Sequence, residues 1–286
     1  MTRPAISAFF DEATNSVSYL VADPATRAAA VIDPVLDFDP ASGAIATRSA
    51  DRILSAANEQ GLRIEWVLET HVHADHLSAA ALIRERTGAK VGIGCGVRDV
   101  QAVFGPMLGA QDLGDGDFDR LFADGDTLAL GELAVEVMAT PGHTPSCVSY
   151  RVGDALFVGD TLFMPDYGTA RTDFPGGDAA QLYRSIQRIL ALPPATRLFL
   201  CHDYKAPGRD EFAWQTTVGD QEDGNVHVGG KSEEAFVELR RARDATLCAP
   251  KLLYPAIQVN IRGGRLPPAD ADGSHYLRIP VTFPAG

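Results

Sequence analysis

Short apolar runs separated by turn residues make up the beginning of the chain. Each run is rich in β-branched or aromatic residues, and the pairs Asp23-Pro24 and Asp33-Pro34 bound two of them. Runs of this kind between turn residues predict β-strands. We expect five strands in the first third of the sequence, at residues 5–10, 16–23, 28–34, 63–69 and 90–94.

Helical periodicity follows these strands. Ile53, Leu54 and Ala57 repeat at the spacing of one helix face, and Gly61 lies where such a helix would end. Ser232 precedes two acidic residues and an apolar pattern, which is typical of a helix N-cap. We expect four helices, at residues 50–60, 77–87, 179–190 and 232–244.

The second half of the chain returns to the strand pattern. We expect strands at residues 133–140, 147–152, 155–159 and 197–201. Residues 94–126 are rich in Gly and Asp and predict a surface excursion over the sheet. The residues from 250 onward are rich in Pro and Gly and predict a C-terminal lobe of loops and short strands.

One sequence segment occurs twice. VSYLVAD at 17–23 and VSYRVGD at 148–154 agree at five of seven positions. Each copy is followed by a strand that ends in an aspartate, Asp33 in the first half and Asp160 in the second. The pattern indicates a duplicated half. Strands and helices in both halves favour an α/β fold in which two sheets pack together with helices outside.

Composition narrows the classes of protein. The chain has 286 residues, 45% hydrophobic and 22% charged, which is typical of a globular protein with a full core. Its formal net charge is −13 and no basic run occurs, so we expect no nucleic-acid partner. We expect a main catalytic domain at 1–245 and a C-terminal extension at 246–286 packed on it.

The sequence also bears on compartment. No apolar run approaches the roughly 18 residues of a membrane helix, and Asp11 and Glu12 come too early for a signal peptide. We therefore expect a cytoplasmic protein with no membrane partner. The four cysteines are far apart and form no C-x-x-C pair, which predicts packed thiols rather than disulfides or a zinc ribbon.

Five of the seven histidines gather in three places, each at the end of a predicted strand. The densest group is His71-x-His73-x-Asp75-His76. Four partly ionisable groups in six residues need solvent or pairing, and a metal ion satisfies them because imidazole nitrogen and carboxylate oxygen are both metal ligands. The other two histidine places are His143 and His202, and Asp160 ends a further predicted strand.

These motifs resemble the metallo-β-lactamase superfamily. The resemblance rests on the six-residue histidine motif followed in order by Gly142-His143-Thr144, Gly159-Asp160-Thr161 and His202. It implies an αββα sandwich, two mixed β-sheets with helices on the outer faces, and a metal site at one edge of the sheets. Most members of the superfamily bind two metals and hydrolyse esters, thioesters or lactams.

A narrower resemblance, to the persulfide dioxygenases, rests on the histidine motif, on DTLF at 160–163, on ARTDF at 170–174, on CHDY at 201–204 and on the tail LLYPAIQVNIRGGRLPP. It implies an oxidoreductase of sulfide metabolism that uses O2 to convert glutathione persulfide, or a similar low-molecular-weight persulfide, into sulfite and thiol. It also implies one Fe(II) per chain, held by His71, His143 and Asp160, and suggests a homodimer.

An alternative is a thioester hydrolase of the glyoxalase II type with two metal ions. Its second-metal ligands Asp75, His76 and His202 are all present, whereas in the dioxygenase these residues and His73 orient the ligands instead. Zinc is a possible occupant in either case. A non-enzymatic metal-binding or sulfur-sensing protein is a third interpretation.

Glutathione has two carboxylates, so its site should offer basic or hydroxyl donors. Arg171 and Tyr204 lie in matching motifs, although Arg171 is as readily explained by an ion pair with Asp173. The full set of candidate substrate contacts is Arg171, Tyr204, Lys205, Arg262 and Arg265. His227 has no evident partner in the sequence, and we expect it to be solvated.

Overall fold

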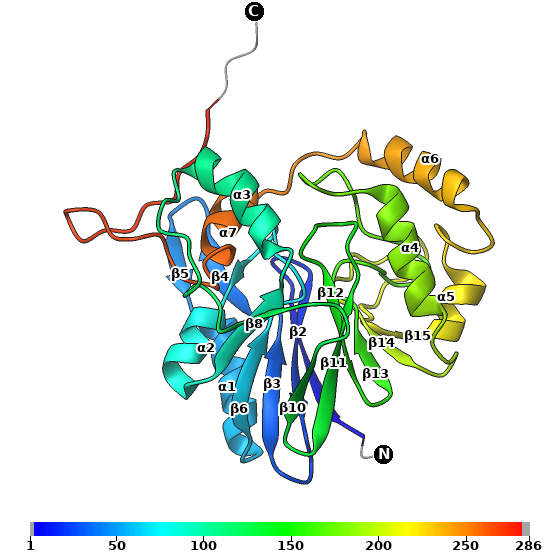
Figure 1. The fold of residues 1–286 in the computed structure, drawn as a ribbon, viewed down its shortest axis with the longest axis horizontal. Coiled ribbons are helices and arrows are strands. Elements are labelled where there is room, and N and C mark those ends of the chain that lie inside the picture. The colour runs from blue at the N-terminus through cyan, green and yellow to red at the C-terminus, as the bar shows by residue number, and fades with distance from the viewer. Residues whose placement is uncertain (1–2, 282–286) are drawn as a thin grey trace, which may run out of the picture.

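Two six-stranded sheets packed face to face form the centre of the molecule in the computed structural model, which describes residues 3–281 (Figure 1). The first sheet has the order β1-β2-β3-β6-β8-β9. Its strands are β1 (Ala5–Asp11), β2 (Ser16–Ala22), β3 (Ala28–Ile32), β6 (Arg63–Leu68), β8 (Lys90–Gly94) and β9 (Arg120–Phe122).

The second sheet has the order β10-β11-β12-β13-β14-β15. Its strands are β10 (Thr127–Leu130), β11 (Leu133–Ala139), β12 (Val148–Val152), β13 (Ala155–Phe157), β14 (Arg197–Phe199) and β15 (Gln215–Thr217). A small third sheet of order β5-β4-β7 consists of β4 (Val35–Asp39), β5 (Ala44–Ala46) and β7 (Leu77–Ser78).

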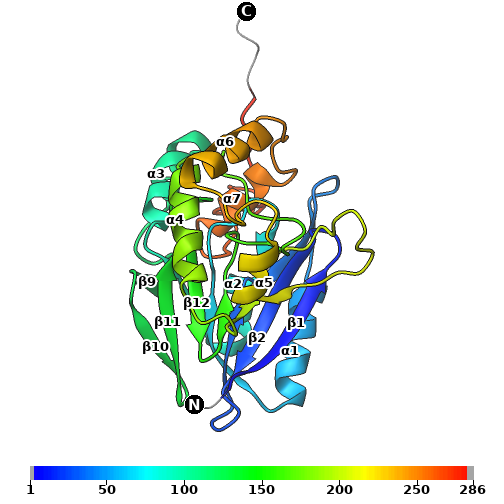
Figure 2. The same ribbon diagram turned by 90° about the vertical axis from the view of Figure 1, so that its right-hand side faces the viewer.

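Helices cover the outer faces of the two large sheets. The helices are α1 (Arg48–Glu59), α2 (Ala80–Thr87), α3 (Val97–Leu108), α4 (Ala179–Leu190), α5 (Val218–Gly224), α6 (Glu233–Asp244) and α7 (Leu253–Asn260). The first sheet packs on α1 and α2, whereas α4 packs on the second sheet and carries α6 (Figures 1 and 2). The expected αββα sandwich is thus confirmed. Within residues 3–281, no helix is both long and apolar enough to cross a bilayer.

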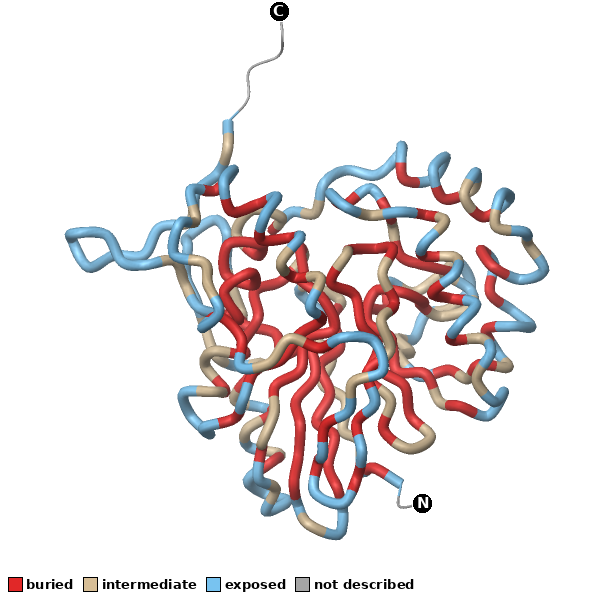
Figure 3. The backbone as a smooth tube through the Cα atoms, in the orientation of Figure 1, coloured by how far each residue is buried: buried red, intermediate tan, exposed pale blue. Residues whose placement is uncertain are grey.

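Buried residues run along the strands at the centre of the molecule (Figure 3). Their hydrophobic side chains form three clusters. Between the two sheets, Tyr19 and Ile32 of the first sheet meet Tyr150 and Phe157 of the second. The layer between the first sheet and its helices also takes in Val259 of α7. The central strands β2, β3 and β13 are therefore buried on both faces, whereas β10 and β11 expose alternate residues.

The repeated segment corresponds to a repeated topology. β2 pairs with β3 antiparallel and β3 with β6 parallel; β12 pairs with β13 antiparallel and β13 with β14 parallel. Asp33 follows β3 and Asp160 follows β13. The two halves therefore present corresponding strand ends, and corresponding aspartates, at the same edge of the sandwich.

Three expectations about secondary structure were wrong. The excursion at 94–126 contains α3 and β9, because Val97, Val100, Phe104 and Leu108 recur on one buried face despite the neighbouring glycines. The helix expected from residue 77 begins at Ala80, since Leu77 and Ser78 pair with β4. The C-terminal lobe contains α7.

Candidate metal centre

Three predicted ligands meet at one edge of the sandwich. His71 follows β6, His143 follows β11 and Asp160 follows β13. β11 and β13 are both antiparallel to β12, so their carboxyl ends lie at the same edge of the second sheet. Gly159 has a φ of +52°, and a Cβ there would lie 2.5 Å from Thr70 Oγ1 of the first sheet, so only glycine allows this approach.

The ligand atoms converge on one point. Oδ2 of Asp160 lies 3.6 Å from Nε2 of His143 and 4.0 Å from Nε2 of His71. One ligand atom of each residue falls within 4.8 Å of the others, and all three side chains are largely buried. This separation leaves room for an ion at ordinary ligand distances.

Hydrogen bonds fix the orientation of the His71 ring. Thr70 Oγ1 donates its proton to Asp33 Oδ2 at 2.8 Å, so it accepts from Nδ1 of His71, 3.0 Å away. With its proton on Nδ1, the neutral ring presents the lone pair of Nε2 toward Asp160. A buried partner of this kind is what a metal-ligating histidine requires.

His143 is oriented in the same way by a different partner. Its Nδ1 donates to the carbonyl oxygen of Arg171 at 2.8 Å, which again leaves the lone pair on Nε2. The side chain of Arg171 forms two bonds to Asp173 and one to the carbonyl oxygen of Cys248. Arg171 therefore acts on the site through its backbone, from a loop that its own guanidinium holds in place.

A metal ion fits these residues. Nε2 of His71 and Oδ1 of Asp160 are buried and have no hydrogen-bond partner among the described residues, an expensive arrangement unless an ion takes their lone pairs. Burial lowers the pKa of His71 well below its usual value, and the neighbouring histidines act in the same direction, so the ring is neutral as ligation requires.

His73 lies beside His71, with ring centroids 4.1 Å apart, but is paired with other carboxylates. Its Nε2 lies 3.0 Å from Asp33 Oδ1 and 3.4 Å from Glu69 Oε2, in a fully buried pocket. Burial lowers the pKa of His73, but the Asp33 carboxylate outweighs this effect, and the net pKa is raised well above the usual value. Its ring is thus paired with carboxylates, and one of its ring nitrogens also lies within 4.8 Å of ligand atoms of Asp75 and His76.

A second group lies on the other side of Asp160. Nε2 of His202 is 3.3 Å from Asp160 Oδ1 and 3.5 Å from Asp75 Oδ2. Nδ1 of His76 is 3.3 Å from Asp75 Oδ2, and its Nε2 is buried without a partner. The structure thus brings all the predicted second-metal ligands together beside the first three.

One of the candidate substrate contacts, Tyr204, lies beside this group. The ring of Tyr204 stacks on His202 at 5.5 Å and contacts Phe163 and Tyr167, which gives an aromatic wall of three residues next to the cluster. Lys205 places its ammonium over the ring of Phe212. Neither side chain is tied to a carboxylate among the described residues.

The structure does not bring Arg262 and Arg265 to the cluster. Arg262 is buried and pairs through two nitrogens with Asp112, at 2.6 and 2.7 Å. Arg265 pairs with Asp117. These carboxylates already occupy both guanidinium groups, so within the described residues neither arginine is placed to bind a substrate carboxylate beside the metal.

Sequence reasoning missed the residues that support the ligands. Thr70, Asp33 and Glu69 carry no motif, although the repeated segment marked Asp33 as the counterpart of Asp160. Asn260, far along the chain, donates hydrogen bonds to the histidine loop, residues 71–76. No pattern in the sequence indicated this role. Two cysteines are packed as expected, since burial raises the pKa of the Cys147 thiol to about 12 and that of Cys201 above its usual value. Cys95 and Cys248 are free but exposed, so the expectation of packed thiols was wrong for them.

Comparisons with known proteins agree with this fold. The metallo-beta-lactamase superfamily pattern matches residues 12–202. The chain belongs to that superfamily, whose members are metal-dependent enzymes. Its resemblance to the persulfide dioxygenases is also confirmed: the crystal structure of ETHE1 from Myxococcus xanthus has a TM-score of 0.74 and 34% identity, covering 91% of this chain and 100% of that one.

Three relatives carry different names. A probable metallo-hydrolase of Burkholderia pseudomallei is 52% identical over 96% of this chain and 98% of its own length. The beta-lactamase hydrolase-like protein of Agrobacterium fabrum is 54% identical over 97% of this chain, which spans 65% of that longer protein. The mitochondrial persulfide dioxygenase ETHE1 of Homo sapiens is 35% identical over 68% of this chain and 66% of its length.

Proposed function

We propose that this protein is an iron-dependent persulfide dioxygenase. The observation that supports it most directly is the pairing of His73, whose Nε2 lies 3.0 Å from Asp33 Oδ1 and 3.4 Å from Glu69 Oε2. Removing it from the ligand set leaves His71, His143 and Asp160, the combination of two histidines and one carboxylate typical of non-haem Fe(II) oxygenases. The likeness to the ETHE1 proteins supports the same assignment.

The proposed reaction balances without a further reductant. A persulfide RSSH, O2 and water give the thiol RSH and sulfite with two protons. The sulfane sulfur loses four electrons to O2, the sulfur–sulfur bond breaks, and water supplies the third oxygen of sulfite. Bound Fe(II) would supply the redox chemistry and the open coordination positions that O2 and a persulfide sulfur need.

The residues of the chain have defined parts in this scheme. Thr70 and the Arg171 carbonyl hold the two imidazoles by Nδ1, so both Nε2 lone pairs point at one ion. The aromatic wall of Phe163, Tyr167 and Tyr204 borders the cluster and would exclude water from one side of a bound persulfide. We assign the thiol carrier as glutathione or a similar small thiol, with Tyr204 and Lys205 as its contacts.

An oxygen electrode tests the proposal. Protein purified anaerobically and loaded with Fe(II) is offered glutathione persulfide, and both O2 consumption and sulfite are measured. We expect one sulfite per O2, and loss of activity together with iron in His143→Ala. His275→Ala, which removes an exposed histidine, is the matched control and should keep both. No O2 consumption by protein with a full iron content would overturn the assignment.

A dinuclear thioester hydrolase is the second candidate. It is favoured by the group of Asp75, His76 and His202, in which His202 lies 3.3 Å from the other carboxylate oxygen of Asp160. The metallo-hydrolase name of a relative also favours it. This function requires two metal ions per chain and hydrolysis of S-lactoylglutathione. Metal analysis and that assay on the same protein sample separate the two candidates.

A further inference from the structure

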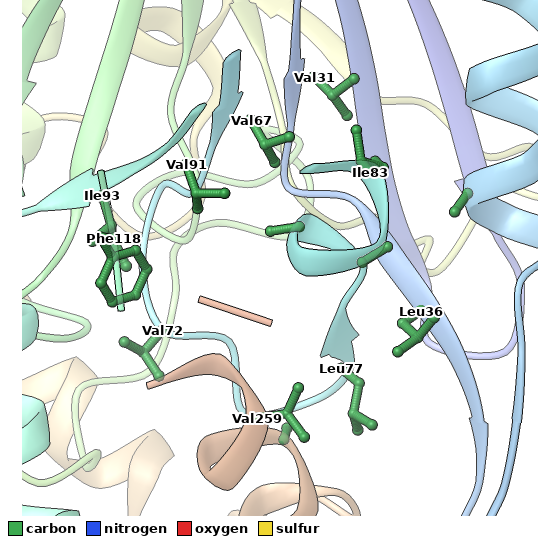
Figure 4. Close-up of a cluster of buried hydrophobic side chains, with 14 of the residues drawn as sticks. Val31, Leu36, Val67, Val72, Leu77, Ile83, Val91, Ile93, Phe118 and Val259 are labelled. Atoms are coloured by element: carbon green, nitrogen blue, oxygen red, sulfur yellow. The ribbon is translucent and has the colours of Figure 1, made fainter. Parts of the chain in front are cut away.

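The C-terminal helix α7 lies against the histidine loop, residues 71–76, which carries the histidine motif. Figure 4 shows Val259 of α7 in one buried cluster with Val72, which lies within this loop, and Leu77, which follows it. Gly264, just beyond the helix, has a φ of +84°, and a Cβ there would lie 2.8 Å from the nitrogen of Ala81. The extension therefore packs on the loop with little free space.

Asn260, the last residue of α7, makes three hydrogen bonds to this loop. Its Nδ2 donates to the carbonyl oxygens of His73 and His76, at 2.9 and 2.8 Å. Its Oδ1 accepts from the backbone nitrogen of Ser78 at 2.8 Å. The side-chain amide thus uses both donor hydrogens and its acceptor on one segment of six residues, 73–78, and Asn260 is buried.

These bonds matter because the loop has little structure of its own. Residues 71–76 belong to no helix or strand. Their backbone carbonyls therefore need partners from elsewhere, and buried carbonyls without partners are costly. Asn260 satisfies two of them, at His73 and at His76, and thereby sets the path of the chain immediately after the ligand His71.

We infer that Asn260 is a positioning residue for the metal centre, acting through the backbone of residues 73–78. The inference rests on the proposed metal site, but not on which reaction the site catalyses. Asparagine suits this position because its amide both donates and accepts, whereas aspartate would face two carbonyl oxygens with a carboxylate. The extension outside the matched superfamily pattern thus completes the centre that lies within it.

Metal affinity of chelator-treated protein tests the inference. The dissociation constant for Co²⁺ is measured by competition with a chromogenic chelator. We expect Asn260→Ala to weaken binding by about 10–100-fold, the range found for partners of metal ligands. Hydrogen exchange of residues 71–79 in the metal-free protein should become faster in the same variant, because the Ser78 amide loses its acceptor.

Gln258 provides a matched control on the same helix. It is equally buried, but its amide bonds to the carbonyl oxygens of Tyr254 and Arg278 and to the Arg278 nitrogen, not to the histidine loop. Gln258→Ala should therefore lower stability while leaving Co²⁺ affinity within about twofold of the parent protein, since no bond to a metal-site residue is lost.

Two results would overturn the inference: equal Co²⁺ affinities in the parent and Asn260→Ala, or equal losses in Asn260→Ala and Gln258→Ala. If Asn260→Ala does not fold, Asn260→Asp keeps the volume and the bond from Ser78 and decides the question by the same titration. The test uses no substrate, so a failed dioxygenase assay leaves its outcome intact.

Discussion

Asp33 and Asp160 follow corresponding strands of the two halves, yet they bind different partners. Asp160 directs Oδ2 toward His143 and His71, whereas Asp33 lies 3.0 Å from His73 and accepts from both the nitrogen and the hydroxyl of Thr70. One aspartate of the repeat is thus a proposed metal ligand, and its counterpart anchors the residues around the ligands.

Replacing Asp33 should therefore damage the fold. Asp33→Asn removes a buried carboxylate that is paired with His73, and breaking one side of such a pair costs about 3–5 kcal/mol. We expect a loss of this size in the urea unfolding of metal-free protein. Asp39→Asn, at an exposed carboxylate in a surface turn, should cost less than about 1 kcal/mol. Similar losses in the two variants would show that Asp33 is no anchor.

Thr70→Val tests how the His71 ring is held. Valine matches threonine in shape but lacks the oxygen that accepts from His71 Nδ1, so the ring can turn or change tautomer. We expect about 10–100-fold weaker Co²⁺ binding in a chelator competition. Thr216→Val, a buried threonine near β14, is the control and should bind Co²⁺ normally. Unchanged affinity in Thr70→Val would refute this role.

Stability should fall in mild acid because of His227. This histidine is buried, contrary to the expectation of a solvated ring, and accepts from the Thr169 nitrogen through Nδ1 at 3.0 Å. Burial, together with Arg240 and Arg243, lowers the pKa of His227 to about 4. Below pH 6.5 the unfolded chain therefore takes up a proton that the folded chain does not. The free energy of unfolding falls as the pH is lowered from 6.5 to 4.

The comparison is between the parent protein and His227→Asn, whose Oδ1 keeps the acceptor but cannot be protonated in this range. Between pH 7 and pH 5 the melting temperature of the parent should fall by about 2–5 °C more than that of the variant. Parallel curves for the two proteins would mean that His227 is not the group responsible.

Metal binding should stabilise the whole domain. An ion bound to the folded state at about 100 times its dissociation constant adds about 2.7 kcal/mol, which for a chain of this size raises the melting temperature by several degrees. We expect this shift when Co²⁺ is added to chelator-treated protein, and its loss in His143→Ala. His275→Ala should retain it. A shift that survives in His143→Ala would place the ion elsewhere.

Periodicity predicted the elements whose local signals agree with their packing. The helix at 179–190 occurs with those limits, capped by Asp178, and α6 begins after Ser232 as expected. α3 and α7 were missed because Gly105, Pro106 and Pro255 argue locally against a helix. Pro255 lies in the first turn of α7, where its missing N–H costs nothing, and burial on the core decides the rest.

The candidate site likewise contains residues that the sequence pattern reveals and residues that it does not. His71, His143 and Asp160 were found because ligand chemistry leaves a dense pattern at strand ends. The partners that orient them could not be found in this way. Thr70, the Arg171 carbonyl and Asn260 act through hydrogen bonds that depend on three-dimensional register, and a lone Thr or Asn carries no spacing signal. Arg262 and Arg265 looked available in the sequence because their partners Asp112 and Asp117 are about 150 residues away.

Because the proposed ligands are divided between the two halves, metal affinity depends on the position of one sheet relative to the other. His71 follows a strand of the first sheet, whereas His143 and Asp160 follow strands of the second, so neither half holds the complete set of proposed ligands. Tyr150 joins the sheets inside the core by donating to the carbonyl oxygen of Glu69, two residues before His71. A substitution of Tyr150 changes no proposed ligand. A displacement of one sheet relative to the other would nevertheless separate the ligand atoms and weaken binding of the ion.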